Sequence, residues 1–163
     1  MTTIRAVPIS KEGFAPYGRY YNLYEEGDNV ETEDFRFYMI PRPLIDEPLN
    51  LGITCVKAGD FDSVSMERHV LTEEMLFCGD ADMVLTVANS DPEGLPFEKD
   101  VGAFVMKPGD IAVLGLGTWH DANHGVDKDT MYYFLAANKD PSPDSREIEW
   151  VPIQPGPVRV LVK

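Results

Sequence analysis

The sequence predicts an all-β fold, either a sandwich or a small barrel of short strands. Proline and glycine, with 13 copies each, interrupt the chain at close intervals, which suits short strands joined by turns better than long helices. The runs between these breaks are rich in Val, Ile, Tyr and Phe, the residues that favour strands. At 163 residues with 44% hydrophobic composition, the chain fits one domain, residues 1–163, with a single core.

The N-terminal segment predicts an edge strand followed by the one short helix of the fold. Residues 3–9 form the expected strand, with Pro8 near its end. Ser10 is suited to cap a helix of one or two turns, because its hydroxyl can accept a backbone N–H. Pro16 and Gly18 are expected to end that helix.

The rest of the chain alternates between predicted strands and loops. The strands are residues 19–24, 35–40, 51–57, 63–69, 74–78, 83–88, 103–107, 111–114, 118–123, 130–137 and 158–162. Residues 24–34, rich in carboxylates, predict a solvated, mobile loop. Residues 89–100 predict a second loop, which separates two halves of a barrel that face each other. The tail consists of residues 141–157. Within it, the alternating positions of Ile148 and Trp150 predict a short strand that docks on the rest of the protein.

Composition excludes several classes of function. The formal charge of -14 repels phosphate backbones and anionic lipids, which disfavours nucleic-acid and membrane binding. Cys55 and Cys78 lie in apolar runs and are expected to be buried, reduced thiols. The first residues, Met-Thr-Thr-Ile-Arg, lack the basic and then apolar pattern of a leader, and nowhere do about 18 apolar residues run uninterrupted. We therefore expect a soluble, cytoplasmic protein without disulfides.

The three histidines, His69, His120 and His124, lie in two short segments. Because strand side chains alternate between faces, Glu67 and His69 should point to one side and Arg68 to the other. Imidazole is the commonest metal ligand and a good proton carrier near neutral pH. Two histidines that only satisfy hydrogen bonds in a barrel mouth are the alternative.

These segments resemble the two motifs of the cupin superfamily. The first motif, His-x-His followed by Glu, reads Glu67-Arg68-His69 and then Glu73 or Glu74. The second reads Gly109 in the turn Lys107-Pro108-Gly109-Asp110, then Gly115-x-Gly117 and His120, with Gly115 in place of a proline. The resemblance implies a cupin-like double-stranded β-helix, or jelly-roll barrel, with one short N-terminal helix.

A closer resemblance, to the ureidoglycolate lyase family, covers the whole chain. The residues that carry it are Val7-Pro8-Ile9-Ser10, Glu12, Phe14, Tyr17-Gly18, Glu67-Arg68-His69, Ala103-Phe104 and Gly117-Thr118-Trp119-His120. It implies a homodimer that cleaves the C–N bond of ureidoglycolate to glyoxylate and urea, a reaction of allantoin degradation. The chain departs from the family pattern at Asp121-Ala122, where His-Pro is usual, and at Glu74, where Gln is usual.

That chemistry needs a base for the hydroxyl, a proton donor for urea and a positive centre for the carboxylate. The resemblance suggests a divalent metal ion, zinc, manganese, nickel or iron, held by Glu67, His69, Glu74 and His120. The expected catalytic residues are Glu67 and His124, with His124 on the same strand face as His120.

Other readings remain open. Histidine and carboxylate ligands in a cupin also suit a metal-dependent isomerase, epimerase or oxygenase acting on a sugar or another small polar acid. A non-catalytic ligand-binding cupin is the third class, favoured by Asp121 and Ala122. Arg68 is expected in a salt bridge or an interface, while Trp119, Tyr132, Tyr133 and Phe134 are expected in the core.

Overall fold

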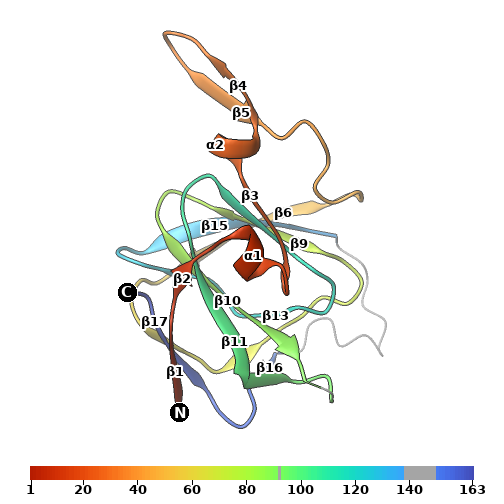
Figure 1. The fold of residues 1–163 in the computed structure, drawn as a ribbon, viewed down its shortest axis with the longest axis vertical. Coiled ribbons are helices and arrows are strands. Elements are labelled where there is room, and N and C mark those ends of the chain that lie inside the picture. The colour runs from red at the N-terminus through yellow and green to blue at the C-terminus, as the bar shows by residue number, and fades with distance from the viewer. Residues whose placement is uncertain (92, 138–149) are drawn as a thin grey trace.

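Two five-stranded sheets form the body of a computed structural model that describes residues 1–91, 93–137 and 150–163 (Figure 1). One sheet has the order β3 (Gly18–Asn22), β12 (Asp110–Leu114), β9 (Glu74–Cys78), β15 (Thr130–Ala136) and β6 (Asn50–Val56). The other has the order β13 (Trp119–His120), β10 (Met83–Ser90), β11 (Pro96–Met106) and β2 (Val7–Pro8), with β14 (His124–Gly125) also paired to β10. The predicted all-β fold is confirmed.

The main core lies between these two sheets. Leu76 and Leu114 from one sheet pack with Leu85 and Phe104 from the other, and all four side chains are buried. Each such burial contributes about 1.5–3 kcal/mol to folding. Burial of these apolar side chains between the two sheets therefore stabilises the barrel.

The predicted N-terminal helix is present as α1 (Lys11–Phe14). The Ser10 hydroxyl caps it by accepting the Gly13 N–H at 3.1 Å. The ring of Phe14 is fully buried and meets Phe104 edge-on, with ring centroids 5.5 Å apart. The helix thus fixes the N-terminal segment to the main core.

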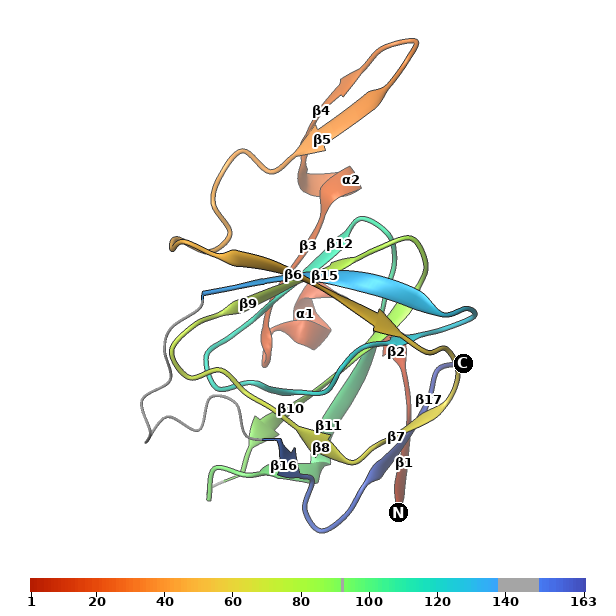
Figure 2. The ribbon, with the colours of Figure 1, turned by 180° about the vertical axis from the view of Figure 1, so that it is seen from behind.

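Smaller sheets close the barrel on the side that carries both termini (Figure 2). β1 (Thr2–Arg5), β17 (Val158–Leu161) and β7 (Phe61–Ser63) form one, and β16 (Val151–Pro152) pairs with β8 (Ser65–Met66). The predicted strand at residues 3–9 is therefore two strands, β1 and β2, separated by Ala6. The expected docking of the tail is seen in β16, whereas Ile148 lies outside the described residues.

Both predicted loops contain more regular structure than expected. Residues 24–34 include part of α2 (Leu23–Glu26) and β4 (Asp28–Glu31), which pairs with β5 (Arg36–Met39) in a hairpin that projects from the body (Figure 1). Asn22 starts α2 by accepting the N–H groups of Tyr24 and Glu25. Most of residues 89–100 belongs to the ends of β10 and β11. Both segments were predicted as loops from their polar composition. The prediction failed because strand pairing, which composition does not reveal, gives these segments regular structure.

The two cysteines differ in environment. Cys78 is buried as expected, and burial, with nearby carboxylates, raises the pKa of its thiol to about 12. Cys55 is exposed, contrary to prediction, because it lies on the outer face of the edge strand β6. Among the described residues, no helix is long and apolar enough to span a membrane.

Candidate metal centre

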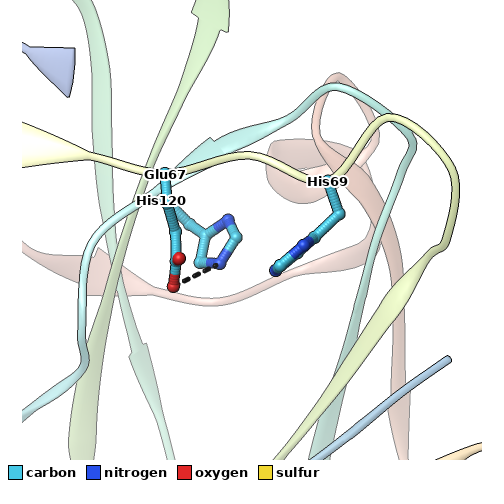
Figure 3. Close-up of side chains that lie close together, drawn as sticks. All are labelled: Glu67, His69 and His120. Carbon is cyan, nitrogen blue, oxygen red and sulfur yellow. Dashed lines mark ion pairs between the residues drawn. The ribbon is translucent and has the colours of Figure 1, made fainter. Parts of the chain in front are cut away.

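Glu67 and His120 face each other across a backbone bridge. The Glu67 N–H donates to the His120 carbonyl at 2.9 Å, and the His120 N–H donates to the Glu67 carbonyl at 2.8 Å. Directly opposed residues in an antiparallel pair place their side chains on the same face. The Glu67 Oε1 atom accordingly lies 3.7 Å from the His120 Nε2 atom (Figure 3).

A glycine turn positions His69 beside this pair. Gly117, at a φ of 79°, donates its N–H to the His69 carbonyl at 2.7 Å. A positive φ is the region that favours glycine, so the Gly115-x-Gly117 element has a structural reason. Ligand atoms of Glu67, His69 and His120 all lie within 4.8 Å of one another (Figure 3).

Glu74 is the fourth predicted ligand, and it reaches the same point from the start of β9. Its Oε2 atom lies 3.0 Å from Nε2 of His120 and 3.2 Å from Nε2 of His69. Burial alone would raise the pKa of Glu74, but the two imidazoles lower it to about 2. Glu73 points elsewhere and pairs with Arg19 at 2.6 Å. The sequence left open whether Glu73 or Glu74 is the candidate ligand, and in the structure Glu74 is the one that lies beside the two imidazoles.

The second nitrogen of His120 fixes its ring. Nδ1 lies 3.3 Å from the Thr118 carbonyl, and a proton held there leaves the Nε2 lone pair directed toward the carboxylates. Burial opposes the charged imidazole, yet Glu74 and Glu67 raise the pKa of His120 above its ordinary value. The His120 ring is therefore held in one orientation by the Thr118 carbonyl at Nδ1 and by the carboxylates at Nε2.

This donor set fits a divalent cation. The Oε2 atom of Glu74 is buried and lacks a hydrogen bond of acceptable geometry, although two ring nitrogens lie close to it. A cation near these nitrogens would satisfy the unpaired oxygen. Imidazole and carboxylate ligands suit zinc, manganese, iron and nickel. The predicted ligands Glu67, His69, Glu74 and His120 thus converge in space.

A cavity of about 340 Å³ opens next to these four side chains. Its other lining residues are Thr54, Leu76, Asp121, Ala122, Tyr132, Phe134, Ala136 and Trp150. Sequence reasoning assigned Tyr132 and Phe134 to the core and did not select Thr54 or Trp150. Alternate residues of a strand share one face, so the spacing of Tyr132, Phe134 and Ala136 along β15 could have predicted that all three face the interior. Tyr133, between them, is 40% exposed instead of buried.

His124 is not brought to the cavity. Its ring stacks on Phe61, with centroids 3.6 Å apart and planes within 8°. On β10, Val87 is opposite His120 and Val84 is opposite His124. His124 follows His120 by four residues, whereas Val84 and Val87 are three residues apart, so the segment from His120 to His124 has one extra residue. This extra residue turns His124 to the other face of the sheet. The predicted continuous strand at residues 118–123 is wrong for this reason.

Comparisons with solved structures confirm the cupin-type fold. A 3,4-ketoisomerase from Helicobacter canadensis is 11% identical, with a TM-score of 0.53 over 79% of this chain and 90% of that chain. The TDP-quinovose 3,4-ketoisomerase from Campylobacter jejuni is 8% identical, with a TM-score of 0.52 over 81% and 91%. A 3′-monoepimerase from Streptomyces bikiniensis, in complex with dTDP-quinovose, is 12% identical, with a TM-score of 0.55 over 85% and 70%.

At these identities the similarity shows the fold and not the reaction. No family model matches the sequence, and no curated protein matches it. The comparisons thus support the cupin-type fold and give no support to the ureidoglycolate lyase family. The homodimer and the cytoplasmic location implied earlier stay predictions.

Proposed function

We propose that this protein is a metal-assisted cupin enzyme that isomerises or epimerises a small substrate with a hydroxyl next to a carbonyl. The observation that supports the proposal is the convergence of two imidazoles and two carboxylates at one end of a cavity of about 340 Å³. Small-molecule sites span about 300–1,000 Å³. The substrate is therefore small, and a monosaccharide is of suitable size.

The reaction requires one proton to move between two carbons, or between two faces of one carbon. Glu67 is the less buried of the two proposed ligand carboxylates. The exposed fraction of its side chain is 24%, against 9% for Glu74. Glu67 accepts the proton from the carbon next to the carbonyl, and the C–H electron pair forms a carbon–carbon double bond. The Tyr132 hydroxyl donates its proton to the carbonyl oxygen.

Return of both protons completes the cycle without any oxidant or reductant. Glu67 gives its proton to the neighbouring carbon in an isomerisation, or to the carbon that lost it in an epimerisation. The oxygen that must become the carbonyl returns a proton to Tyr132. A divalent ion held by Glu67, His69, Glu74 and His120 would supply a positive centre that polarises the substrate oxygens. Burial raises the pKa of Tyr132, so its hydroxyl carries a proton at neutral pH.

The carbon–nitrogen lyase reaction is the second candidate. It is favoured by one observation, the meeting of Glu67-Arg68-His69 with Trp119-His120, the elements that resemble ureidoglycolate lyases. That reaction begins with loss of a proton from the substrate hydroxyl and not from carbon. Proton exchange at carbon therefore distinguishes the two reactions.

The test measures metal content first and hydrogen exchange second. We expect the purified protein to bind a divalent ion with micromolar affinity or better, measured by calorimetry on protein stripped with a chelator and then titrated with Mn²⁺ or Zn²⁺. Free sugars and small hydroxy acids are then incubated in D₂O, and proton NMR follows loss of the C–H signal next to the carbonyl. Exchange that requires the metal supports the proposal.

Three results would overturn it. Glyoxylate release from ureidoglycolate, without C–H exchange in any sugar, would assign the lyase reaction. Metal binding with neither exchange nor glyoxylate release would leave the ligand-binding cupin, and absence of metal binding would remove the proposed centre altogether.

A further inference from the structure

Trp150 presents a large aromatic surface at the cavity. The residue lines the cavity, and 46% of it is exposed. The other tryptophan, Trp119, is 1% exposed. An indole face left open beside a polar site is suited to stack on a ligand, because it offers apolar area with little loss of side-chain freedom.

The strand register explains why Trp150 lies beside the metal ligands. In the antiparallel pair of β16 and β8, Val151 is opposite Met66 and Pro152 is opposite Ser65. The same register, continued by one residue, places Trp150 opposite Glu67, and side chains in opposed positions share a face. Trp150, Glu67 and His120 all line the cavity.

The indole is carried by a well-anchored strand. Ile153 donates its N–H to the Val64 carbonyl at 3.0 Å, and its side chain is 2% exposed. Val151 packs against a second cluster of buried side chains, which includes Ile153, Met66 and Trp119. An aromatic group held in this way loses little freedom when a ligand stacks on it.

The side chains that the structure describes around the cavity include carboxylates but no cationic partner for a phosphate group. Glu67, Glu74 and Asp121 contribute three carboxylates to the lining, and none of the described lining residues is a lysine or an arginine. A divalent ion held by Glu67 and Glu74 would offset their two charges, which leaves Asp121 and no lysine or arginine among the described lining residues to bind a phosphate group. The remaining wall, with Leu76, Phe134 and two alanines, is apolar.

We infer that the substrate is an unphosphorylated, uncharged monosaccharide whose ring lies on the face of Trp150. A sugar ring has an apolar C–H face, which the indole covers, and hydroxyl edges, which the polar end of the cavity binds. This inference rests on the proposed function and narrows its substrate to one class.

The test compares free and phosphorylated sugars on the metal-loaded protein. D-xylose, D-mannose and D-fructose are titrated by calorimetry, together with mannose 6-phosphate and fructose 6-phosphate. We expect one or more of the free sugars to bind, and the free hexose to bind at least about tenfold more tightly than its phosphate. Binding should change the tryptophan fluorescence, since Trp150 is the exposed tryptophan.

Substitutions assign the effect to the indole. Trp150→Ala should weaken sugar binding about tenfold, while Trp150→Tyr, which keeps an aromatic face, should stay within about threefold of the parent but lose the fluorescence response. Phe37→Ala is the matched control, because Phe37 is 48% exposed and lies on the projecting hairpin, away from the cavity. It should change neither measurement.

Mn²⁺ titration of each variant separates the two proposals. Mn²⁺ bound by every variant, with sugar affinity reduced in Trp150→Ala, supports the inference. Equal binding of a hexose and its phosphate, no binding of any free sugar, or unchanged affinity in Trp150→Ala overturns it. Failure of the parent protein to bind Mn²⁺ would instead overturn the metal centre and with it the proposed function.

Discussion

The guanidinium of Arg68 stacks on the indole of Trp119, with its Cζ atom 4.6 Å from the ring centroid. Both groups also donate to the Ser90 hydroxyl, each at 3.0 Å. Arg68 lies between Glu67 and His69, and Trp119 immediately precedes His120. The side chains that point away from the cavity thus hold together the two segments whose ligands converge inside it.

This contact gives the Glu-Arg-His and Trp-His elements a physical reason. Arg68 was expected in a salt bridge or an interface. Among the described residues its contacts are the Trp119 ring and the Ser90 hydroxyl and not a carboxylate, so the interface stays a prediction, while the expected burial of Trp119 is confirmed. A cation over an indole contributes about 0.5–2 kcal/mol, depending on how far it is removed from water. The pair therefore holds in place the two segments that carry the proposed metal ligands.

Arg68→Ala should lower Mn²⁺ affinity about tenfold, because changes behind metal ligands commonly cost about 10–100-fold. Arg68→Lys should recover part of this loss, since an ammonium can also lie on the indole but cannot match the planar stacking of a guanidinium. Calorimetric titration of both variants measures the effect. Arg159→Ala, which breaks an outer ion pair with Asp62, is the control. Equal affinity in all four proteins would exclude the positioning role.

Glu74→Gln should reduce metal affinity by more than about 100-fold, because it removes the charge from a buried ligand whose neighbours are both imidazoles. The adjacent carboxylate gives a matched control. Glu73→Gln loses only a partly exposed ion pair with Arg19, which should cost at most about 1 kcal/mol of stability and leave the metal affinity unchanged. A similar loss in both variants would show that Glu74 has no special place in the site.

The core of this site could be predicted from sequence because its residues follow local rules. Alternation along an extended segment puts Glu67 and His69 on one side, and the glycine turn before Trp119 limits where His120 can lie. The choice between Glu73 and Glu74 could not be made in this way. It depends on the register of β9 against β12 and β15, which is set by contacts between distant segments.

The errors have equally specific causes. His124 was placed with His120 by counting alternate positions, but the segment from His120 to His124 has one more residue than the matching stretch of β10, which reverses the face. Such an irregularity leaves little trace in a single sequence. Trp150 is distant from the other cavity residues in the chain, and only the pairing of β16 with β8 brings it there.

Gly117→Ala should cost about 1–2 kcal/mol of unfolding free energy, because alanine is strained at a φ of 79°. No heavy atom lies within 4 Å of the added Cβ position, so backbone strain is the cause and not a clash. Gly156→Ala meets equally open space and has no positive φ. It should be neutral or slightly stabilising. Urea unfolding of the two variants makes the comparison, and equal stability would argue against strain at Gly117.

Protonation of His124 should destabilise the fold. Burial holds the pKa of His124 below its ordinary value of 6.5, although Asp121 and a hydrogen bond to the Lys57 carbonyl act in the opposite direction. Between that lowered pKa and 6.5, the unfolded chain binds more protons than the folded protein. The stability that neutral His124 provides is therefore fully present above pH 6.5 and is lost as the pH falls through this window.

His124→Gln removes this dependence while keeping a polar side chain of similar length. The difference in unfolding free energy between parent and variant, from urea titrations at pH values from about 7.5 down to about 5, should shift steadily against the parent as the pH falls. His69 and His120 are present in both proteins, so their titration cancels in the difference. Parallel pH profiles would mean that the imidazole stacked on Phe61 has the same proton affinity in the folded and unfolded states, and that its burial has no electrostatic consequence.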